Sequence, residues 1–210
     1  MTNVISFPTQ EKTYNRNEYI GGSDANRLLY RLDKQDWETV GQQWDALYLE
    51  KIGEQDPEDL SENIRVQIGI ATEHLNIQWL ERELNQEITR NVVVKPDGFM
   101  ASNLDGVTKS IELVECKHTS ERNRMDIVAE NYYPQLQHYM MHTDTDMIHL
   151  AVIFGNARWE STIITSDPTY QIQLKSVETI FWDCVTDKKL PSNHLDSLFG
   201  AKIKAPTNIK

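Results

Sequence analysis

The chain has 210 residues, of which 39% are hydrophobic and 25% charged, with a formal net charge of −11 at pH 7. Because this content suits one buried core, we expect a single domain over residues 1–190, with a flexible arm at 1–15 and a basic tail at 191–210. The acidic balance argues against broad non-specific attraction to nucleic acid, which depends on lysine and arginine at phosphates. It leaves open a nucleic-acid enzyme whose basic residues line one groove.

The sequence gives no sign of a membrane segment or a cysteine-based site. It has no apolar signal region at its start and no apolar run of bilayer-spanning length, so we expect a soluble cytoplasmic protein that does not bind membranes. Cys116 and Cys184 are the only cysteines, and they form no CxxC or Cys/His cluster. Neither a disulfide framework nor a zinc site is predicted, and both thiols are expected in the core.

A glycine pair precedes the first predicted helix. The run Gly-Gly-Ser-Asp from Gly21 to Asp24 predicts Ser-Asp as the N-cap of a helix through Leu29. Glycine lets the backbone approach a ligand, and the free amides of a helix start favour an anion. A terminal phosphate would suit this position, with Ser23 donating and Arg16 as counter-charge. The alternative is an ordinary cap after a flexible turn.

Two amphipathic helices are expected next, over residues 36–52 and 61–85, with a loop at 54–60. The first places Trp37 and Trp44 in the core. In the second, Glu73 interrupts a stripe of apolar residues: Val66, Ile70, Ile77, Leu80 and Leu84. A carboxylate on a buried face needs a metal or a basic partner, whereas a stripe that faces a groove would leave Glu73 hydrated. Gly69 either admits a substrate backbone or serves close helix packing.

Three strands at 88–95, 99–105 and 111–117 are expected to form a meander. Asp105 would end the second strand, and Glu115 and Lys117 would share one face of the third, about 6.6 Å apart along the strand. Two carboxylates beside a lysine suit Mg²⁺, a phosphate and an attacking water. The alternative assigns Asp105 to turn chemistry and the Glu-x-Lys pair to an exposed surface.

The second half of the chain alternates helices and strands. Residues 118–130 are expected to be a loop with a helical turn, followed by a helix from Pro134, in the first helical position, to about residue 143. Gln135 at that helix start is positioned to bond a lysine or a phosphate. Solvation is the alternative for Gln135, and it is the expectation for His138 and His142.

A hairpin and a final helix complete the predicted elements. Strands at 147–154 and 158–165 should be joined by a Gly-Asn turn. The last helix should begin at Ser166-Asp167-Pro168, pack on the sheet through an apolar stripe, and stop before Pro191.

In this order the motifs resemble the PD-(D/E)XK nucleases and, within them, the YqaJ-type recombination exonucleases of the phage lambda exonuclease family. The matching pieces are Tyr19-Ile20-Gly21-Gly22-Ser23-Asp24-Ala25, Gly69-Ile70-Ala71-Thr72-Glu73, Leu104-Asp105-Gly106, Glu115-Cys116-Lys117 and Gln135-Leu136-Gln137-His138-Tyr139-Met140. The resemblance implies a mixed α/β (α+β) fold with a restriction-endonuclease-like core, in which helices flank a central mixed five-stranded sheet.

The resemblance also implies a role for each matching residue. Asp105 and Glu115 would bind Mg²⁺, or Mn²⁺ in its place, with the Cys116 carbonyl as a further ligand and Glu73 completing the acidic site. Lys117 would position or activate the attacking water, and Gln135 would orient it. The remaining pair, Arg16 and Ser23, would hold the 5′-phosphate of DNA.

The activity implied is 5′-to-3′ digestion of linear double-stranded DNA from 5′-phosphorylated ends, leaving 3′ single strands for phage-type recombination. A homo-oligomer, by resemblance a trimer, and a single-strand annealing partner are implied as well. The sequence departs from the family pattern at Cys116, where an aliphatic residue is usual, and in its acidity. Alternatives are a nuclease for single-stranded or flap DNA, or an acidic interaction protein without enzymatic activity.

Overall fold

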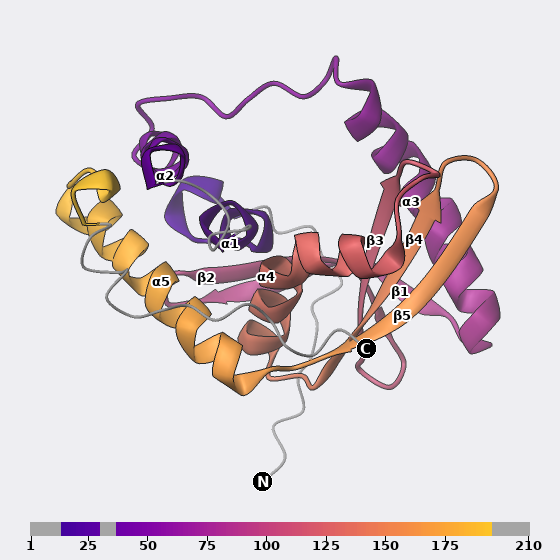
Figure 1. The fold of residues 1–210 in the computed structure, drawn as a ribbon. Coiled ribbons are helices and arrows are strands. Elements are labelled where there is room, and N and C mark those ends of the chain that lie inside the picture. The colour runs from indigo at the N-terminus through magenta and orange to yellow at the C-terminus, as the bar shows by residue number, and fades with distance from the viewer. Residues whose placement is uncertain (1–13, 30–36, 195–210) are drawn as a thin grey trace, which may run out of the picture.

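The structure, a computed structural model, describes residues 14–29 and 37–194. Along the chain it contains η1 (Arg16–Glu18), α1 (Gly22–Leu29), α2 (Trp37–Lys51), α3 (Ile64–Leu84), β1 (Ile88–Asp97), β2 (Met100–Thr108), β3 (Leu113–Thr119), α4 (Met125–Thr143), β4 (Met147–Phe154), β5 (Arg158–Thr165), α5 (Pro168–Asp187) and η2 (Pro191–His194) (Figure 1). Most of the predicted flexible arm and of the basic tail lies outside the described residues.

A five-stranded sheet in the order β1-β2-β3-β4-β5 forms the centre of the fold. β1, β2 and β3 make the antiparallel meander expected from the sequence, and β4 and β5 make the expected hairpin around Gly155. β3 and β4 are parallel, and α4 connects them. Parallel neighbours require a crossover connection, which α4 provides. The mixed five-stranded sheet flanked by helices is thereby confirmed.

The two faces of the sheet are covered by different helices. Side chains alternate along β3, so Leu113 packs in the core with α1, α2, α4 and α5, while Val114 packs with Ile77 and Leu80 of α3. Figure 1 shows α3 at one side of the sheet and the other helices grouped apart from it. Glu115 and Lys117 therefore continue the strand face that carries Leu113.

Helix α4 differs from the prediction in length and surroundings. It begins at Met125, so Pro134 lies inside the helix and not at its first position. Proline removes one helical hydrogen bond, but every residue from Tyr133 to Met140 is buried, and this packing holds the helix through the proline. The predicted loop at 118–130 was wrong beyond Arg124, because tertiary burial outweighs local propensity here.

Two further boundaries and the packing of α5 differ from the sequence-based expectation. α1 begins at Gly22, so Ser23 and Asp24 lie in its first turn, where the Asp24 carboxylate accepts the Gly21 amide at 3.0 Å. β2 runs on to Thr108, so Asp105 lies inside the strand and not at its end. α5 has the predicted Asp167 cap but packs mainly on α1, α2 and α4, with little contact to the sheet.

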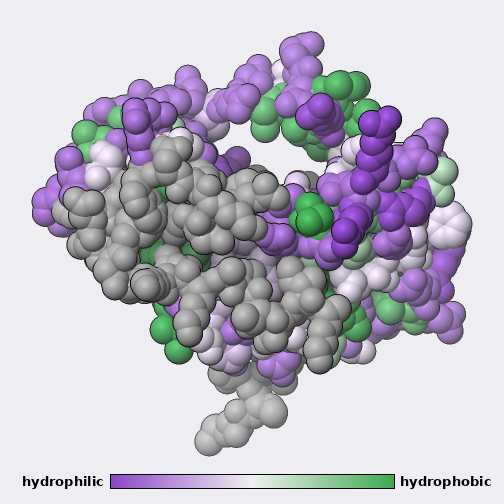
Figure 2. All heavy atoms as spheres, in the orientation of Figure 1, coloured by the Kyte–Doolittle hydropathy of each residue, from purple (hydrophilic) through white to green (hydrophobic). Residues whose placement is uncertain are grey.

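Segment 52–63 links α2 to α3 without helix or strand. Figure 2 shows an opening through the molecule beside this segment. The first turns of α3 carry exposed apolar side chains, with Ile64 68% and Ile70 63% accessible, so the predicted stripe is buried only from Ile77 onward. No helix in the described part of the chain is long and apolar enough to cross a membrane.

Candidate functional site

The candidate site forms where β2 and β3 stop pairing. Their ladder includes Gly106 opposite Val114, and the same register places Asp105 opposite Glu115. Instead of a further backbone bond, the Asp105 carboxylate accepts the Cys116 amide at 2.7 Å. The Asp105 side chain therefore takes the place of a backbone hydrogen bond between β2 and β3 at this point. Its carboxylate lies toward the face of β3 that bears Glu115.

Glu115 is the centre of a buried hydrogen-bond network. Its Oε1 accepts from the Lys117 ammonium at 2.5 Å and from the Gln135 amide at 2.7 Å. The same Gln135 nitrogen donates to the Tyr139 hydroxyl at 3.0 Å. The Lys117 ammonium also lies over the ring of Tyr132, 4.4 Å from its centroid. The structure thus brings Asp105, Glu115, Lys117 and Gln135 together, as expected from the sequence.

Burial and mutual repulsion change the proton affinities of these groups. Burial raises the pKa of Glu115 to about 8, and the neighbouring Asp105 adds to this shift. Burial also raises the pKa of Asp105 and, with Asp105 nearby, that of Glu73. Burial alone would lower the pKa of Lys117, but Glu115 and Asp105 outweigh it and raise that pKa. The site therefore contains carboxyl groups whose ionised form a bound cation would stabilise.

The donor set suits a hard divalent cation with an open coordination sphere. Glu115 Oε2 is buried and has no hydrogen-bond partner among the described residues, which makes it a vacant acceptor beside Asp105. No group of three or more His, Cys, Asp or Glu side chains in the described part of the chain is arranged to hold a metal ion. Mg²⁺ commonly binds one or two carboxylates and completes its shell with water and phosphate oxygens. Two carboxylates fit that pattern, whereas a closed zinc cage requires four ligands.

Helix α3 brings Glu73 to the edge of this site. Glu73 is partly exposed, which favours the interpretation that the stripe faces a groove there and not the core. A Cβ added at Gly69, one turn earlier, would meet nothing within 4 Å. Close helix packing is therefore not the reason for this glycine, and the alternative of substrate approach remains.

Asn76 connects α3 to β3. Its amide nitrogen donates to the carbonyls of Lys117 at 3.1 Å and Ala151 at 2.9 Å, and its oxygen accepts from the Trp159 indole at 2.7 Å. Nothing in the sequence signalled this residue, because a single asparagine in an amphipathic helix is usually on the surface. Thr72, which hydrogen-bonds His118 at 2.9 Å, adds a second contact between α3 and β3.

A pocket of about 200 Å³ lies at the start of α1. Arg16, Ser23 and Tyr139 are among its lining residues, with backbone from Gly21 and Gly22. The Arg16 guanidinium donates to Ser23 Oγ at 3.4 Å, and its side chain is 60% exposed. The pairing of Ile20 with Met100 of β2 brings this segment to the sheet. The structure thus places the two predicted phosphate-binding residues side by side.

A buried ion pair forms part of the wall of this pocket, since Asp24 is one of its lining residues. The Lys51 ammonium at the end of α2 donates to Asp24 at 2.7 Å and to the Arg16 carbonyl at 2.6 Å. Both charged side chains are 3% exposed. Sequence reasoning missed Lys51, since a lysine that ends an amphipathic helix usually points into solvent.

Gly22 couples the pocket to the carboxylate centre. A Cβ added there would fall 2.5 Å from the Tyr139 ring and 2.9 Å from Gln135 Cγ. Only glycine allows this approach of α1 to α4. Tyr139 consequently lines the pocket and also contacts Gln135, the donor to Glu115.

The histidines of α4 are structural and are not solvated, which corrects the expectation for His138 and His142. His138 is completely buried, bonded to Glu178 of α5 at 2.7 Å and to the Ala101 carbonyl at 3.0 Å. His142 is partly buried and bonded to Ser102 at 2.8 Å. Cys116 and Cys184 are buried free thiols, as expected.

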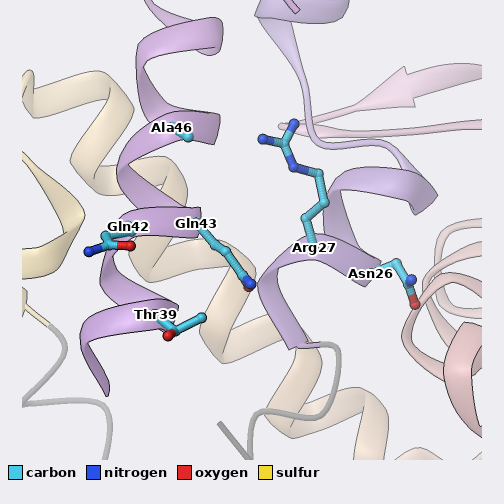
Figure 3. A pocket seen from close by; sticks show the side chains of 6 residues that line it. All are labelled: Asn26, Arg27, Thr39, Gln42, Gln43 and Ala46. Carbon is cyan, nitrogen blue, oxygen red and sulfur yellow. The ribbon is translucent and has the colours of Figure 1, made fainter. Parts of the chain in front are cut away.

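A larger pocket, of about 560 Å³, lies between α1 and α2, lined by Asn26, Arg27, Thr39, Gln42, Gln43 and Ala46 (Figure 3). It contains none of the predicted site residues. Arg27 is held by Glu50 through two hydrogen bonds of 2.8 Å. The Arg27 cation of this pocket is already paired, and its lining residues include no carboxylate. This pocket therefore lacks the groups that phosphodiester chemistry requires.

Comparisons with solved structures agree on the fold. The chain is similar to an alkaline exonuclease (LHK-Exo) from Laribacter hongkongensis, with a TM-score of 0.65 and 12% identity over 87% of this chain and 93% of that one. A structure of LHK-Exo in complex with dAMP gives a TM-score of 0.65 at 13% identity, covering 89% of this chain and 96% of that one. A phage-related exonuclease from Haemophilus somnus 129PT gives 0.61 at 14% identity, covering 85% and 95%.

No curated protein matches the chain in sequence. The family model described as a YqaJ-like viral recombinase domain matches residues 13–146. This range includes α1, the carboxylate-bearing strands and α4, which together form the site described above. The chain therefore belongs to the YqaJ-like viral recombinase domain family.

Proposed function

We propose that the protein is a Mg²⁺-dependent exonuclease that digests linear double-stranded DNA from 5′-phosphorylated ends in the 5′-to-3′ direction. Family membership supports a recombination nuclease, and the similar solved structures include an alkaline exonuclease and a phage-related exonuclease. The observation that carries the proposal is the buried Glu115 Oε2, which lies beside Asp105 and has no hydrogen-bond partner in the part of the chain that the structure describes. Both lie within reach of a lysine whose ammonium is fixed at 2.5 Å from Glu115.

In this proposal Asp105, Glu115 and the Cys116 carbonyl hold the ion, and Glu73 completes the acidic site. When bound, Mg²⁺ or Mn²⁺ polarises the phosphoryl oxygens and acidifies water. Lys117 holds the attacking water in line with the scissile bond and offsets the charge that develops on the phosphoryl group. Gln135 fixes the orientation of Glu115 and of that water.

Arg16 and Ser23 would determine where cleavage begins. Both residues line the pocket of about 200 Å³ at the start of α1. There the Arg16 guanidinium, the Ser23 hydroxyl and the backbone amides of the helix start could all bind one phosphate. A 5′-phosphate held there would set the first phosphodiester bond against the carboxylates. Cleavage would then proceed from the 5′ end and leave 3′ single strands. A ring-shaped homo-oligomer, by resemblance a trimer, and a single-strand annealing protein are the partners this activity suggests.

The test is digestion of end-labelled linear duplex with and without Mg²⁺, read for polarity and product size. We expect 5′ mononucleotides, dependence on the ion, and faster digestion of 5′-phosphorylated than of 5′-hydroxyl ends. Lys117→Ala should abolish hydrolysis while duplex binding persists. Undiminished cleavage by that variant would sink the assignment.

The same digestion separates the other candidates. A nuclease for single-stranded or flap DNA would cut those substrates in preference to duplex ends and would ignore the 5′-phosphate. An acidic interaction protein, favoured only by the net charge of −11, would bind no divalent ion. Calorimetric titration with Mn²⁺ or Ca²⁺ distinguishes this last candidate from both nucleases.

A further inference from the structure

We propose that the pocket between the start of α4 and the end of β3 is a nucleobase subsite, which holds the base of a nucleotide flanking the scissile phosphate. This inference rests on the proposed nuclease function and adds a second recognition element to it. The pocket has a volume of about 240 Å³ and is lined by Asn26, Thr119, Asn123, Val128, Asn131 and Tyr132.

Two of the lining residues carry unused hydrogen-bond acceptors. Asn26 Oδ1 on α1 and Asn131 Oδ1 on α4 are buried and have no hydrogen-bond partner among the described residues. Figure 3 shows the Asn26 side chain extending from α1 on the side away from α2. A buried carbonyl without a donor costs about 1–3 kcal/mol. A ligand with N–H groups would remove this cost at both positions.

The pocket adjoins the proposed catalytic centre. Tyr132 is one of its lining residues, and the Lys117 ammonium lies over the ring of Tyr132, 4.4 Å from the ring centroid. Asn131 and Tyr132 lie one turn before Gln135 on α4, and Tyr139 lies one turn after it. Helix α4 therefore contributes, in order along the chain, two lining residues of the proposed base pocket, the donor to Glu115, and a lining residue of the pocket at the start of α1.

The lining excludes most other ligands. It contains no lysine, arginine or carboxylate, so it offers neither a phosphate nor a metal ion a charged partner. Amide and hydroxyl groups around an aromatic ring are the chemistry by which proteins recognise base edges and faces. The volume is below the range of about 300–1,000 Å³ typical of drug-sized ligands. It suits one planar base and not a whole nucleotide.

The decisive variants are Asn26→Leu and Asn131→Leu, which keep the side-chain size but remove the amide. Substrates are 5′-phosphorylated duplexes that carry either normal nucleotides or one abasic residue at the first or the second position. We expect each variant to lower kcat/KM on the normal end by about tenfold, the effect of one or two buried hydrogen bonds. On an end with the abasic residue at the recognised position, variant and wild type should cleave at equal rates.

A matched control is Gln173→Leu on α5. Gln173 Oε1 is likewise buried and has no hydrogen-bond partner within residues 14–29 and 37–194, but Gln173 does not line the pocket. For this variant, the difference in kcat/KM between normal and abasic ends should be the same as for the wild type. If the two asparagine variants lose activity equally on normal and abasic ends, or lose none, the subsite is refuted.

Equilibrium binding separates this inference from the nuclease proposal. With Ca²⁺ present, dAMP should bind the wild type about tenfold more tightly than 2-deoxyribose 5-phosphate, and the asparagine variants should narrow that ratio. This result would support the subsite even if no duplex is digested. Equal binding of the two probes by an active wild-type enzyme would overturn the subsite and leave the nuclease assignment intact.

Discussion

Asn76 on α3 donates a hydrogen bond to the backbone carbonyl of Lys117 on β3, with 3.1 Å between nitrogen and oxygen. Glu73 lies one helical turn before Asn76, so this contact sets the position of one proposed metal-site carboxylate relative to the lysine. Asn76 is 1% exposed, and it also hydrogen-bonds the Ala151 carbonyl and the Trp159 indole. The amide of Asn76 therefore joins α3 to β3, in addition to the contact between Thr72 and His118.

Asn76→Leu should reduce both stability and cleavage. It leaves two carbonyls and the Trp159 indole without their present partner, which costs roughly 3 kcal/mol in total, and it removes the hydrogen bond that holds α3 to β3 at Lys117. Urea unfolding and single-turnover cleavage measure the two effects. Trp159→Phe is the control, since it removes one donor to Asn76 but keeps the contact with Lys117, so cleavage should persist. Equal loss of cleavage in both variants would assign Asn76 a purely structural role.

Gly22→Ala should impair cleavage, whereas Gly21→Ala should not perturb the fold. A methyl group at Gly22 would displace Tyr139 and Gln135, while at Gly21 its nearest neighbour would be 3.7 Å away, an ordinary contact. We expect at least a tenfold fall in kcat for the first variant, because Gln135 orients Glu115. A cleavage assay at saturating duplex, with thermal unfolding of both variants, provides the comparison. Wild-type kcat in Gly22→Ala would contradict the proposed coupling.

Lys51→Met should destabilise the protein by about 3–5 kcal/mol, because it removes the closest cation from the buried Asp24 carboxylate. The other cation near this carboxylate, Arg16, lies 3.8 Å away and is 60% exposed. The double variant Asp24→Asn/Lys51→Met should recover part of this loss, since the uncompensated charge is then absent. Denaturant unfolding of the single and double variants measures the difference. Arg27→Met, which breaks the more exposed pair between α1 and α2, should cost much less. A double variant no more stable than Lys51→Met would refute this account of the pair.

Metal binding should tighten as the pH rises. The pKa of Glu115 is raised from its ordinary value of 4.5 to about 8, so at pH 7 the metal-free folded protein retains a proton that the unfolded chain has lost. The stabilising contribution of this proton is complete below pH 4.5 and is lost as the pH rises through about 8. A divalent ion requires the ionised carboxylate and must release the proton.

The shift in melting temperature produced by Mg²⁺ should therefore be larger at pH 8.5 than at pH 6.5. Calorimetry in buffers of different ionisation enthalpy should detect the released proton. Glu115→Gln should remove this proton release and most of the metal-induced shift. A pH-independent shift in the wild type would place the ion elsewhere.

Patterns local in sequence were sufficient for much of the fold. The bounds of β4 and β5 and the Asp167 cap of α5 agree with the prediction, because alternation, turn glycine and cap chemistry all act within a few residues. The same patterns gave the wrong start for α4. Pro134 is locally a signal for the start of a helix. It is tolerated inside α4 because the residues around it are buried against the rest of the protein.

The sequence alone identified the chemical groups of the candidate site: Glu73, Asp105, Glu115, Lys117, Gln135, Arg16 and Ser23. These residues are recognisable because their types and order are the information that the chain carries directly. Tertiary structure decided which of them meet and what holds them there. Lys51 and Asn76 have no local signature, since their roles depend on partners that the fold brings together from distant segments. The glycine pair was visible in the sequence, but only the fold shows that Gly22 lies against Tyr139 and Gln135. The vacant oxygen of Glu115 likewise exists only because burial removes water from it.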